Sequence, residues 1–411
     1  MAVLIIGNGA RESALGKTFL QSPAVSTVYV APGNGGMPLI GLTPVAISEF
    51  DFPALIAFAQ THAVDFTFVG PEAPLAAGIV DAFEAAGLPV FGPRQAVAQL
   101  EASKQFAKAF LRRHGLPTAD ARVVKTLAAA QAAVAAFGLP VVIKADGLAA
   151  GKGVVVAETA AQATATLRDI YAVETPTVVI EAYLQGQEAS VLALYHDEHH
   201  VTLPLAQDHK RRDEGDKGPN TGGMGAISPA PQFTDTEQRQ AQALVTQTLS
   251  GMVAEGLTGT GVLYIGLMFT ATGPQILEYN LRFGDPETQV LLPQVTNDWY
   301  DLIVTLMAGK TPTLHLNGQT YCAVVAAHPS YPGTTKPALP VITPSTEQTA
   351  YWLPAGVAAT ATGLKTHGGR VFTVVGEGAD LAAAQASAYA RLAPLQGELA
   401  VRSDIGWHAL A

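Results

Sequence analysis

Short apolar runs alternate with helical segments along the first hundred residues, and this alternation limits the fold more than any other feature. Val3–Ile6 and Phe66–Val69 have the length and apolar character of buried strands. Ala10–Leu20 and Pro53–Thr61 follow the helical pattern, the second with proline at its start. Strands that alternate with helices form βαβ units, which build parallel sheets. Residues 1–100 are therefore predicted to form a small doubly wound domain with a parallel sheet.

The rest of the chain has a different pattern. Residues 101–295 begin with a helix predicted over Glu101–His114 and continue with strands that are joined by a glycine-rich loop and a long polar segment. Residues 296–411 contain closely spaced prolines, which favour turns and edge strands. A chain of 411 residues is long enough for two to four domains. We therefore predict a multidomain protein of α/β and α+β type, with boundaries near residues 100 and 295.

Composition excludes several classes of protein. Hydrophobic residues make up 48% of the chain and charged residues 14%, which argues against disorder. The formal net charge of −10 argues against a nucleic-acid or anionic-membrane partner, because both require a basic face. No apolar run reaches the ~20 residues of a membrane span, no signal peptide is visible, and Cys322 is the only cysteine. We therefore expect a cytoplasmic protein.

The first candidate site is the turn Gly7–Glu12, which follows a strand and opens a helix. Backbone N–H groups at a helix N-terminus bind anions. A dinucleotide fingerprint would need a small residue where Glu12 stands, and an acidic residue at the end of the second strand, which instead reads Val30–Asn34. NAD binding is therefore disfavoured, whereas a phosphate site and a plain tight turn remain open in equal measure.

The second candidate is a glycine-rich loop between two apolar strands. Val141–Lys144 runs into Ala145–Gly153, and a second strand follows. Glycines let backbone N–H groups turn toward phosphate oxygens, and Lys144 and Lys152 add positive charge. A P-loop would have Ser or Thr in place of Gly153 and a helix in place of the second strand. The segment is therefore predicted to act as a flap over a nucleotide.

The third candidate lies on one strand near the end of the central part. Glu278 and Asn280 alternate along this strand and so point to the same face. Hard oxygen ligands in this arrangement suit Mg²⁺, which takes one or two protein ligands together with phosphates and waters. Arg282 follows at the same spacing and can stabilise a transferring phosphoryl group or an acyl oxyanion. A sheet edge that faces water is the alternative, but it does not account for the charged cluster over 282–287.

Two further segments carry suitable polar residues without being specific by themselves. Glu181 and Glu188 lie near a strand end, where a carboxylate can bind an adenine amino group or ribose hydroxyls. Asp208–Asp213 is rich in charge and is followed by the glycine-rich stretch Gly218–Ala226. Long connections of this kind are often functional, so a substrate loop is predicted, although a charge run alone is ordinarily a solvated face.

Taken together, these residues resemble the ATP-grasp superfamily and, within it, the glycinamide ribonucleotide synthetase family. Matching stretches run along nearly the whole chain, from Val3–Glu12 to Asp404–Trp407. Two motifs are highly specific, Gly-Pro-Asn-Thr-Gly-Gly-Met-Gly-Ala at 218–226 and Arg-Phe-Gly-Asp-Pro-Glu-Thr-Gln at 282–289. Chance agreement of both motifs in this order is negligible.

The resemblance implies a fold and a reaction. Residues 101–295 would adopt an ATP-grasp fold with a mobile flap subdomain at about 119–183, between a Rossmann-like substrate domain (1–100) and a small mixed, β-rich C-terminal domain (296–411). The protein would be a ligase of purine biosynthesis that uses ATP and Mg²⁺ or Mn²⁺. It would join glycine to 5-phosphoribosylamine through glycyl phosphate and release glycinamide ribonucleotide, ADP and phosphate. A monomer with only small-molecule partners is expected.

The resemblance also assigns site residues to positions in this sequence. ATP would be bound by Lys104, Lys144, Gly147, Gly151, Lys152, Gly153, Glu181, Tyr183, Leu184 and Glu188. The metal ion would be bound by Glu278 and Asn280, and the catalytic residues would be Arg282 and Asp285. The two substrates would be bound by Gly9, Glu12, Glu72, Asp208, Lys210, Thr221 and Arg370.

The chain departs from the family pattern at several positions. Ser13 replaces a usual histidine, Ala326–Tyr331 replaces a usual Gly-Gly-Tyr-Pro, and Ala355–Ala358 lacks a usual Gly-Thr-Lys. The stretch Asp169–Val178 is shorter than usual, and the strand Tyr264–Phe269 lacks the acidic metal ligand of many ATP-grasp enzymes. These departures concern the C-terminal phosphate contacts, the closure of the flap and the number of metal ligands.

Three other functions stay open at this point. An ATP-grasp ligase with a different acceptor is compatible with Ser13 and Ala358, although the glycine-rich substrate loop argues against it. An NAD-linked oxidoreductase is disfavoured by Glu12. A non-catalytic nucleotide-binding relative would not need to retain the metal strand with Glu278, nor Arg282.

Overall fold

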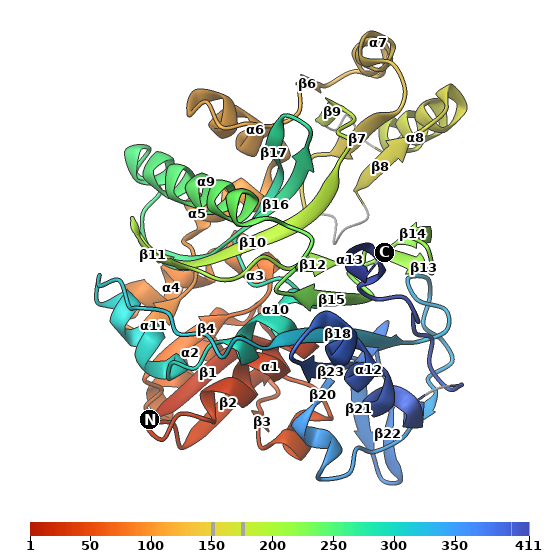
Figure 1. The fold of residues 1–411 in the computed structure, drawn as a ribbon. Coiled ribbons are helices and arrows are strands. Elements are labelled where there is room, and N and C mark those ends of the chain that lie inside the picture. The colour runs from red at the N-terminus through yellow and green to blue at the C-terminus, as the bar shows by residue number, and fades with distance from the viewer. Residues whose placement is uncertain (149–152, 174–176, 396, 411) are drawn as a thin grey trace.

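The computed structural model describes residues 1–148, 153–173, 177–395 and 397–410. The N-terminal part (1–100) and the C-terminal part (296–411) lie side by side below the central part, and a smaller lobe formed by the described residues of 121–182 stands above them (Figure 1). One hydrophobic cluster contains residues of all three parts, Val3, Tyr264 and Leu353 among them. The predicted multidomain fold is confirmed, and its parts share a common interior.

The N-terminal part is an all-parallel sheet with the strand order β3-β2-β1-β4-β5. Its strands are β1 (Ala2–Gly7), β2 (Thr27–Pro32), β3 (Thr43–Pro44), β4 (Phe66–Val69) and β5 (Val90–Phe91). Val3 and Ile5 pack in a cluster with helix α1 (Ala10–Phe19), whereas Leu4 and Ile6 pack in a second cluster with α2 (Phe52–Thr61) and α4 (Ile79–Ala85). Because alternate residues face opposite sides of a strand, helices cover both faces, and the doubly wound prediction is confirmed.

The helix predicted over Glu101–His114 is in fact two helices. They are α5 (Gln95–Ala102) and α6 (Lys104–Arg113). Ser103 separates them with an extended backbone, and its hydroxyl accepts a hydrogen bond from the Phe106 N–H at 3.2 Å. A serine N-cap of this kind starts a new helix and turns the chain, which places Lys104 at the first position of α6.

The central part contains two antiparallel sheets. The upper lobe has the order β6-β9-β7-β8, from β6 (Ala121–Val124), β9 (Val178–Ala182), β7 (Val141–Ala145) and β8 (Val154–Ala157). Its core includes residues of α7 (Leu127–Phe137) and of α8 (Ala160–Val173), a helix that the sequence analysis did not predict. The second sheet has the order β11-β10-β16-β17, from β11 (His199–Thr202), β10 (Gln187–His196), β16 (Thr260–Thr270) and β17 (Gly273–Asn280).

Both faces of the second sheet are covered. Val191 and Ala193 of β10 belong to a cluster with residues of α5, α6 and α9 (Asp235–Ala254). Leu192 and Leu194 of the same strand belong to the cluster that contains α1 and α11 (Trp299–Met307). The N-terminal domain therefore packs directly under the sheet that carries β17.

The C-terminal sheet recruits two strands from the central part. Its order is β12-β15-β18-β23-β20, from β12 (Gln207–Asp208), β15 (Gly225–Ser228), β18 (Thr320–Ala327), β23 (Arg370–Gly378) and β20 (Trp352–Pro354). Helix α12 (Leu381–Leu392) packs on it, and a smaller sheet is formed by β19 (Pro340–Val341), β22 (Gly363–Thr366) and β21 (Val357–Thr360). The predicted substrate loop is thereby attached to both the central and the C-terminal parts.

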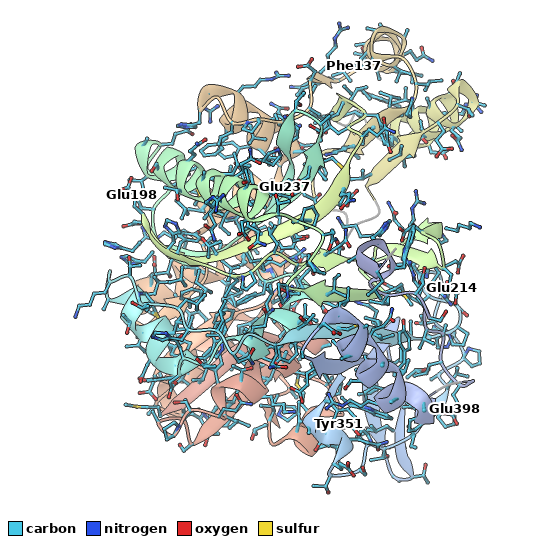
Figure 2. The ribbon with its side chains drawn as sticks, in the orientation of Figure 1. Phe137, Glu198, Glu214, Glu237, Tyr351 and Glu398 are labelled. Atoms are coloured by element: carbon cyan, nitrogen blue, oxygen red, sulfur yellow. The ribbon has the colours of Figure 1, made fainter. Side chains whose placement is uncertain are left out.

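Much of the predicted substrate loop is a hairpin of β13 (Arg211–Asp213) and β14 (Lys217–Asn220). Figure 2 shows Glu214, in the turn of this hairpin, on the outside of the molecule beside the C-terminal part. Among the described residues, none of the helices combines the length and the apolar character that crossing a lipid bilayer requires.

Candidate active site

A buried cluster of two lysines and one glutamate lies between the two central sheets. Glu181 on β9 is 2% exposed, and its Oε2 is 3.0 Å from Lys144 Nζ while its Oε1 is 3.2 Å from Lys108 Nζ. Lys144 Nζ also donates to the Leu277 carbonyl of β17 at 3.1 Å. Burial lowers the pKa of Lys108 to about 8, although Glu181 opposes this. One carboxylate between two amines leaves a surplus of positive charge.

Lys108 was not predicted from the sequence, although a signal exists. Lys104 and Lys108 are four residues apart on α6, so they lie on the same helix face. Lys104 Nζ donates to the Gly147 carbonyl at 2.8 Å, at the start of the glycine-rich loop, and burial lowers its pKa. The helical spacing of the two lysines therefore indicates a basic pair on one face of α6.

The glycine-rich loop leaves β7 and returns to β8. The Ala145 N–H donates to the Gly153 carbonyl at 3.0 Å, which closes the base of the loop. Gly151 and Lys152, which were predicted to contact phosphates, lie outside the described residues. Tyr183 and Leu184 lie in the connection between β9 and β10, where the upper lobe joins the second sheet.

Glu278 and Asn280 lie on β17, opposite Gly266 and Tyr264 of β16. Burial alone would raise the pKa of the Glu278 carboxyl, but the cations of Lys210, Lys144 and Arg282 lower it below its usual value. Glu278 is therefore ionised near neutral pH. Asn280 Oδ1 accepts a hydrogen bond from Arg282 Nη2 at 3.3 Å. The two oxygen donors occupy one face of the strand, as the alternation predicts.

A second, partly buried cluster surrounds Arg282 and has the opposite composition. Its Nε is 3.4 Å from Glu72 Oε2 and 3.3 Å from Glu101 Oε1. Glu101 also accepts a hydrogen bond from the Leu281 N–H at 2.7 Å. Burial raises the pKa of Glu101 to about 7, because the cation of Arg282 does not fully compensate for it and Glu72 adds repulsion. Glu101 was not predicted, and its sequence context carries no signal.

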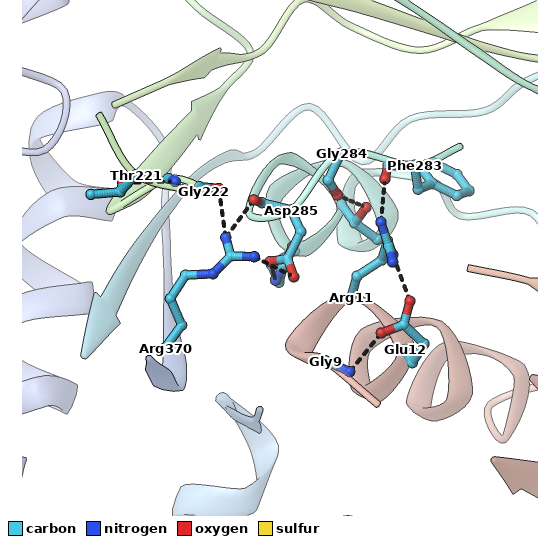
Figure 3. Close-up of polar contacts among 12 residues, drawn as sticks. Gly9, Arg11, Glu12, Thr221, Gly222, Phe283, Gly284, Asp285 and Arg370 are labelled. Atoms are coloured by element: carbon cyan, nitrogen blue, oxygen red, sulfur yellow. Dashed lines mark hydrogen bonds and ion pairs between the residues drawn. The ribbon is translucent and has the colours of Figure 1, made fainter. Parts of the chain in front are cut away.

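Glu12 turns back onto the first β–α turn. Its Oε2 accepts from the Gly9 N–H at 2.7 Å, and its Oε1 is 2.5 Å from Arg11 Nε (Figure 3). A Cβ at Gly70 would lie 2.1 Å from Glu12 Oε1, so this packing requires glycine there. Glu12 is 1% exposed and takes an N–H group that an anion would otherwise use. Arg11 in turn donates to the Phe283 carbonyl at 3.1 Å.

A cavity of about 810 Å³ opens where the three parts of the chain meet. Its walls include Gly9, Asn34, Thr221, Asp285, Tyr331 and Arg370. Glu12 is not among the described lining residues, so it supports the Gly9 turn from behind.

Arg370 and Asp285 are paired at the cavity wall. Arg370 Nη2 donates to Asp285 Oδ2 at 3.1 Å, and Nη1 donates to the carbonyls of Asp285 and Gly222 at 2.6 and 2.7 Å (Figure 3). Gln289 on α10 (Glu287–Leu291) donates to Asp285 Oδ1 at 2.7 Å. Burial alone would raise the pKa of Asp285, but Arg370 and Arg11 lower it. The pair therefore stays charged and ties β23 to the segment after β17.

The predicted substrate loop contributes a further ionic group. Lys210 Nζ is 3.2 Å from Glu188 Oε2 and 3.8 Å from Asp208 Oδ1. Burial raises the pKa of Asp208 to about 7, although Lys210 opposes this. Burial would lower the pKa of Lys210, but Asp208 and Glu188 raise it well above its usual value. Thr221 Oγ1 donates to the Lys210 carbonyl at 2.8 Å, which joins the two ends of the loop.

Two departures from the family pattern have clear structural positions. The Ser13 hydroxyl is buried and donates to the Pro354 carbonyl at 2.6 Å, so it joins the N-terminal and C-terminal parts. Ala358 lines the cavity as a small neutral side chain. Tyr331, at the end of the departing stretch Ala326–Tyr331, accepts a hydrogen bond from the Gly222 N–H through its hydroxyl at 2.7 Å.

Family comparison matches the three parts of the chain in order. Residues 1–101 match the N domain of phosphoribosylglycinamide synthetase, residues 102–288 match its ATP-grasp (A) domain, and residues 321–408 match its C domain. Phosphoribosylamine–glycine ligases of Halalkalibacterium halodurans and Lactococcus lactis are each 45% identical to this chain. The alignments cover 100% of this chain and 98% and 100% of these relatives.

Solved structures are similar over the same length. A phosphoribosylamine–glycine ligase from Thermotoga maritima has a TM-score of 0.82 and 30% identity, with 98% of this chain and 100% of that chain covered. An N5-carboxyaminoimidazole ribonucleotide synthetase in complex with ADP has a TM-score of 0.69 and 15% identity, with 95% and 96% covered. The second likeness concerns the fold alone.

Proposed function

The chain belongs to the phosphoribosylglycinamide synthetase family, and from this premise we propose that it joins glycine to 5-phosphoribosylamine, the second step of de novo purine biosynthesis. ATP drives the ligation, and the products are glycinamide ribonucleotide, ADP and phosphate. The observation that carries the proposal is the cavity in which Gly9, Thr221 and Arg370 meet beside Asp285. An N-terminal turn, the substrate loop and the C-terminal sheet all contribute to this one space.

The chemistry takes two steps. A carboxylate oxygen of glycine attacks the γ-phosphorus of ATP, and the bond from that phosphorus to the ADP oxygen breaks, which leaves glycyl phosphate. The amine nitrogen of phosphoribosylamine then attacks the carbonyl carbon of glycyl phosphate, phosphate leaves with its bonding pair, and the nitrogen loses a proton. Negative charge grows on oxygens in both steps, and Arg282 is the proposed group that neutralises it.

ATP is proposed to lie between the two central sheets. The surplus positive charge of the Lys108–Glu181–Lys144 cluster supports phosphate binding there. Lys104 would steady the glycine-rich loop over the phosphates through the Gly147 carbonyl. Tyr183, Leu184 and Glu188, at the connection between the sheets, are the proposed contacts of the adenosine part.

We propose that Glu278 and Asn280 hold Mg²⁺ or Mn²⁺. An ionised carboxylate and an amide oxygen on one strand face are donors that such hard ions prefer. Among the described residues no group of three His, Cys, Asp or Glu side chains is placed to hold a metal ion, so phosphates and waters would complete its shell. When bound, the ion would neutralise phosphate charge. Arg282 Nη2 would have to share Asn280 Oδ1 with it.

The cavity is the proposed site of phosphoribosylamine. Among its described lining residues, Arg370 is the only lysine or arginine, so it is the proposed partner of the phosphate group. Glu72, Asp208 and Lys210 are proposed substrate contacts on the side of β17, and Glu12 would act through the Gly9 turn.

The division of the chain follows from this assignment. We propose that residues 1–100 bind substrate, that residues 101–295 bind ATP with a flap at about 119–183, and that residues 296–411 close the substrate cavity. The protein is proposed to act as a cytoplasmic monomer on small molecules alone.

The test measures ADP release by the purified protein with Mg-ATP, glycine and freshly prepared phosphoribosylamine, with each component omitted in turn. ADP and glycinamide ribonucleotide that appear only with all three establish the reaction. ADP that forms with another amine or acid, but not with this pair, would show a different ATP-grasp ligase. Protein that binds ATP and releases no ADP with any pair would contradict enzymatic function.

A further inference from the structure

The turn of the β13–β14 hairpin is bound by an arginine near the end of the chain. Arg402 is 1% exposed, and its Nη1 donates to Asp216 Oδ1 at 2.8 Å and to the Arg211 carbonyl at 3.0 Å. Its Nε and Nη2 donate to Asp404 Oδ1 and Oδ2, both at 2.8 Å. The planar guanidinium thus binds the Asp404 carboxylate through two contacts, and with its Nη1 it reaches β13 at Arg211 and the turn of the hairpin at Asp216.

Neighbours of Arg402 hold the same turn. Asp404 Oδ2 accepts from the Gly215 N–H at 2.7 Å. Ser403 Oγ donates to Glu214 Oε1 at 2.5 Å, at the outer tip that Figure 2 labels. Every residue of the turn between the two strands is therefore bonded to the segment 402–408.

Two histidines take part in this contact, one at the turn of the hairpin and one at its base. His408 Nε2 lies 2.6 Å from Asp216 Oδ2. His209, beside the proposed substrate contacts, accepts from the Gly406 N–H through Nε2 at 2.9 Å. Burial and the nearby Arg402 lower the pKa of His209 to about 4, so its ring is neutral and can accept. Residues 402–408 therefore bind the hairpin at its turn and at its base.

The hairpin leads directly into the proposed substrate site. Lys210 precedes β13 and pairs with Asp208 and Glu188, and Thr221 follows β14 and lines the cavity. An isolated two-stranded hairpin is at best marginally stable in water. Its strand residues are mostly exposed, and one further side chain, Arg212, donates to the Tyr331 carbonyl. The hairpin joins Lys210 to Thr221, and its contacts with residues 402–408 add to the backbone bonds at its base, where the Met224 N–H donates to the His209 carbonyl at 2.8 Å.

We infer that residues 402–408 form a clamp, with Arg402 at its centre, that positions Lys210 and Thr221 for phosphoribosylamine. The inference rests on the proposed function of the cavity. Arg402 is a positioning residue, because its four polar contacts are with protein atoms. Loss of the clamp displaces the substrate loop while the lysines that face ATP keep their own partners on β9 and β17.

The experiment compares Asp216→Asn, Arg402→Lys and Arg402→Ala with two matched controls. Lys217→Ala changes a charge on the same hairpin, and Arg391→Ala removes an arginine of the same C-terminal part that donates to the Val375 carbonyl. We expect the KM for phosphoribosylamine to rise by about tenfold to a hundredfold in the clamp variants, while the KM for ATP stays within about twofold. Both control variants should have the wild-type KM for phosphoribosylamine and the wild-type KM for ATP.

Limited proteolysis gives a second readout that does not depend on activity. Trypsin can cleave after Arg211, Arg212 and Lys217, all within the hairpin. We expect faster cleavage there in Asp216→Asn and in the Arg402 variants than in Arg391→Ala. Asp216→Asn matters most, because it removes the charge that Asp216 offers to Arg402 and His408 and leaves the Arg402–Asp404 pair intact.

The outcomes are distinct. Wild-type KM for phosphoribosylamine and wild-type cleavage in Asp216→Asn would overturn the clamp, even if Arg402→Ala does not fold. An equal rise in the KM for phosphoribosylamine and the KM for ATP would also overturn it, because a general structural defect would then explain both changes. If the wild-type protein makes no glycinamide ribonucleotide, the proposed function fails by itself, and the proteolysis comparison alone decides whether the clamp holds the loop.

Discussion

Two charge clusters flank the strand β17, and their compositions are opposite. On one side a single carboxylate, Glu181, lies between Lys108 and Lys144. On the other side a single guanidinium, Arg282, lies between Glu72 and Glu101. The first cluster contacts the strand at the Leu277 carbonyl, and the second contacts the chain just beyond it at the Leu281 N–H. The proposed metal ligands lie between these two points.

The difference shows how each cluster is prepared for its ligand. In the first cluster, burial lowers the pKa of the surplus base, Lys108, to about 8. In the second cluster, burial raises the pKa of the surplus acid, Glu101, to about 7. Each surplus group therefore becomes neutral more readily than it would in water. A nearby anion favours the charged lysine and a nearby cation favours the charged glutamate. The first cluster suits phosphate oxygens, and the second holds a charged Arg282 between two carboxylates.

The largest expected effect is at the strand between the clusters. Glu278→Ala removes the ionised donor of the proposed metal site, which is worth several kcal/mol of charge stabilisation, so turnover should fall by about 10³-fold or more. The fold should remain, as circular dichroism and thermal unfolding would show. Glu158→Gln, at an exposed position of the upper lobe, is the matched control. Unchanged turnover in Glu278→Ala would remove the metal assignment and with it the contrast between the clusters.

The next effect concerns the acidic cluster. Arg282→Met leaves Glu72 and Glu101 without their cation and removes the group proposed to neutralise growing charge. We expect kcat to fall by about 10²–10³-fold while the KM for ATP changes little. Steady-state kinetics measures both constants, with the exposed ion-paired Arg94 changed to Met as control. A rise in the KM for ATP without loss of kcat would place Arg282 with the nucleotide instead.

The basic cluster should give the opposite kinetic signature. Lys144→Met removes the amine that bridges Glu181 and β17, and we expect the KM for ATP to rise by about tenfold to a hundredfold. Lys108→Met should have the smaller effect of the two, because Lys144 remains beside Glu181. Titration with ATP in the absence of substrates separates binding from turnover. Equal losses in the two variants would show that the cluster acts as one structural unit.

The smallest effect is a dependence of stability on pH. The pKa of Glu101 is raised in the folded protein to about 7 from 4.5, so folding favours its protonated form. This contribution is complete below pH 4.5 and is lost as the pH rises through about 7. Relative to Glu101→Gln, the wild-type protein should therefore lose stability between pH 5 and 8, by about 3 kcal/mol at most.

Urea unfolding of both proteins at several pH values measures this difference. The raised pKa of Asp208 contributes equally to both proteins and cancels. Glu84→Gln, at an exposed ion pair, should follow the wild-type curve. If the free energy of unfolding of the wild-type protein followed a curve parallel to that of Glu101→Gln, Glu101 would be ionised throughout this pH range. The second cluster would then not hold a proton on Glu101.

Sequence patterns identified the residues whose local setting is distinctive. Lys144 lies near the end of an apolar strand before a glycine-rich loop, and Glu278 and Asn280 alternate along β17, so their shared face follows from strand geometry. Arg282 lies beyond the end of this strand and meets Asn280 through a hydrogen bond. Lys108 was missed although its spacing from Lys104 is helical. Glu101, Arg402 and the recruitment of β12 and β15 into the C-terminal sheet could not be found this way, because their partners lie far along the chain.

The sequence by itself determined the parallel N-terminal sheet, the family, and the identity of most chemical groups, since these depend on residues two to four positions apart and on contiguous motifs. Tertiary structure alone decided the charge balance of each cluster. Residues 72, 101 and 282 meet only after α3 (Glu72–Ala76), α5 and β17 have packed together. Burial then moves the pKa of Glu101, and burial is a property of the assembled protein that no short stretch of sequence encodes.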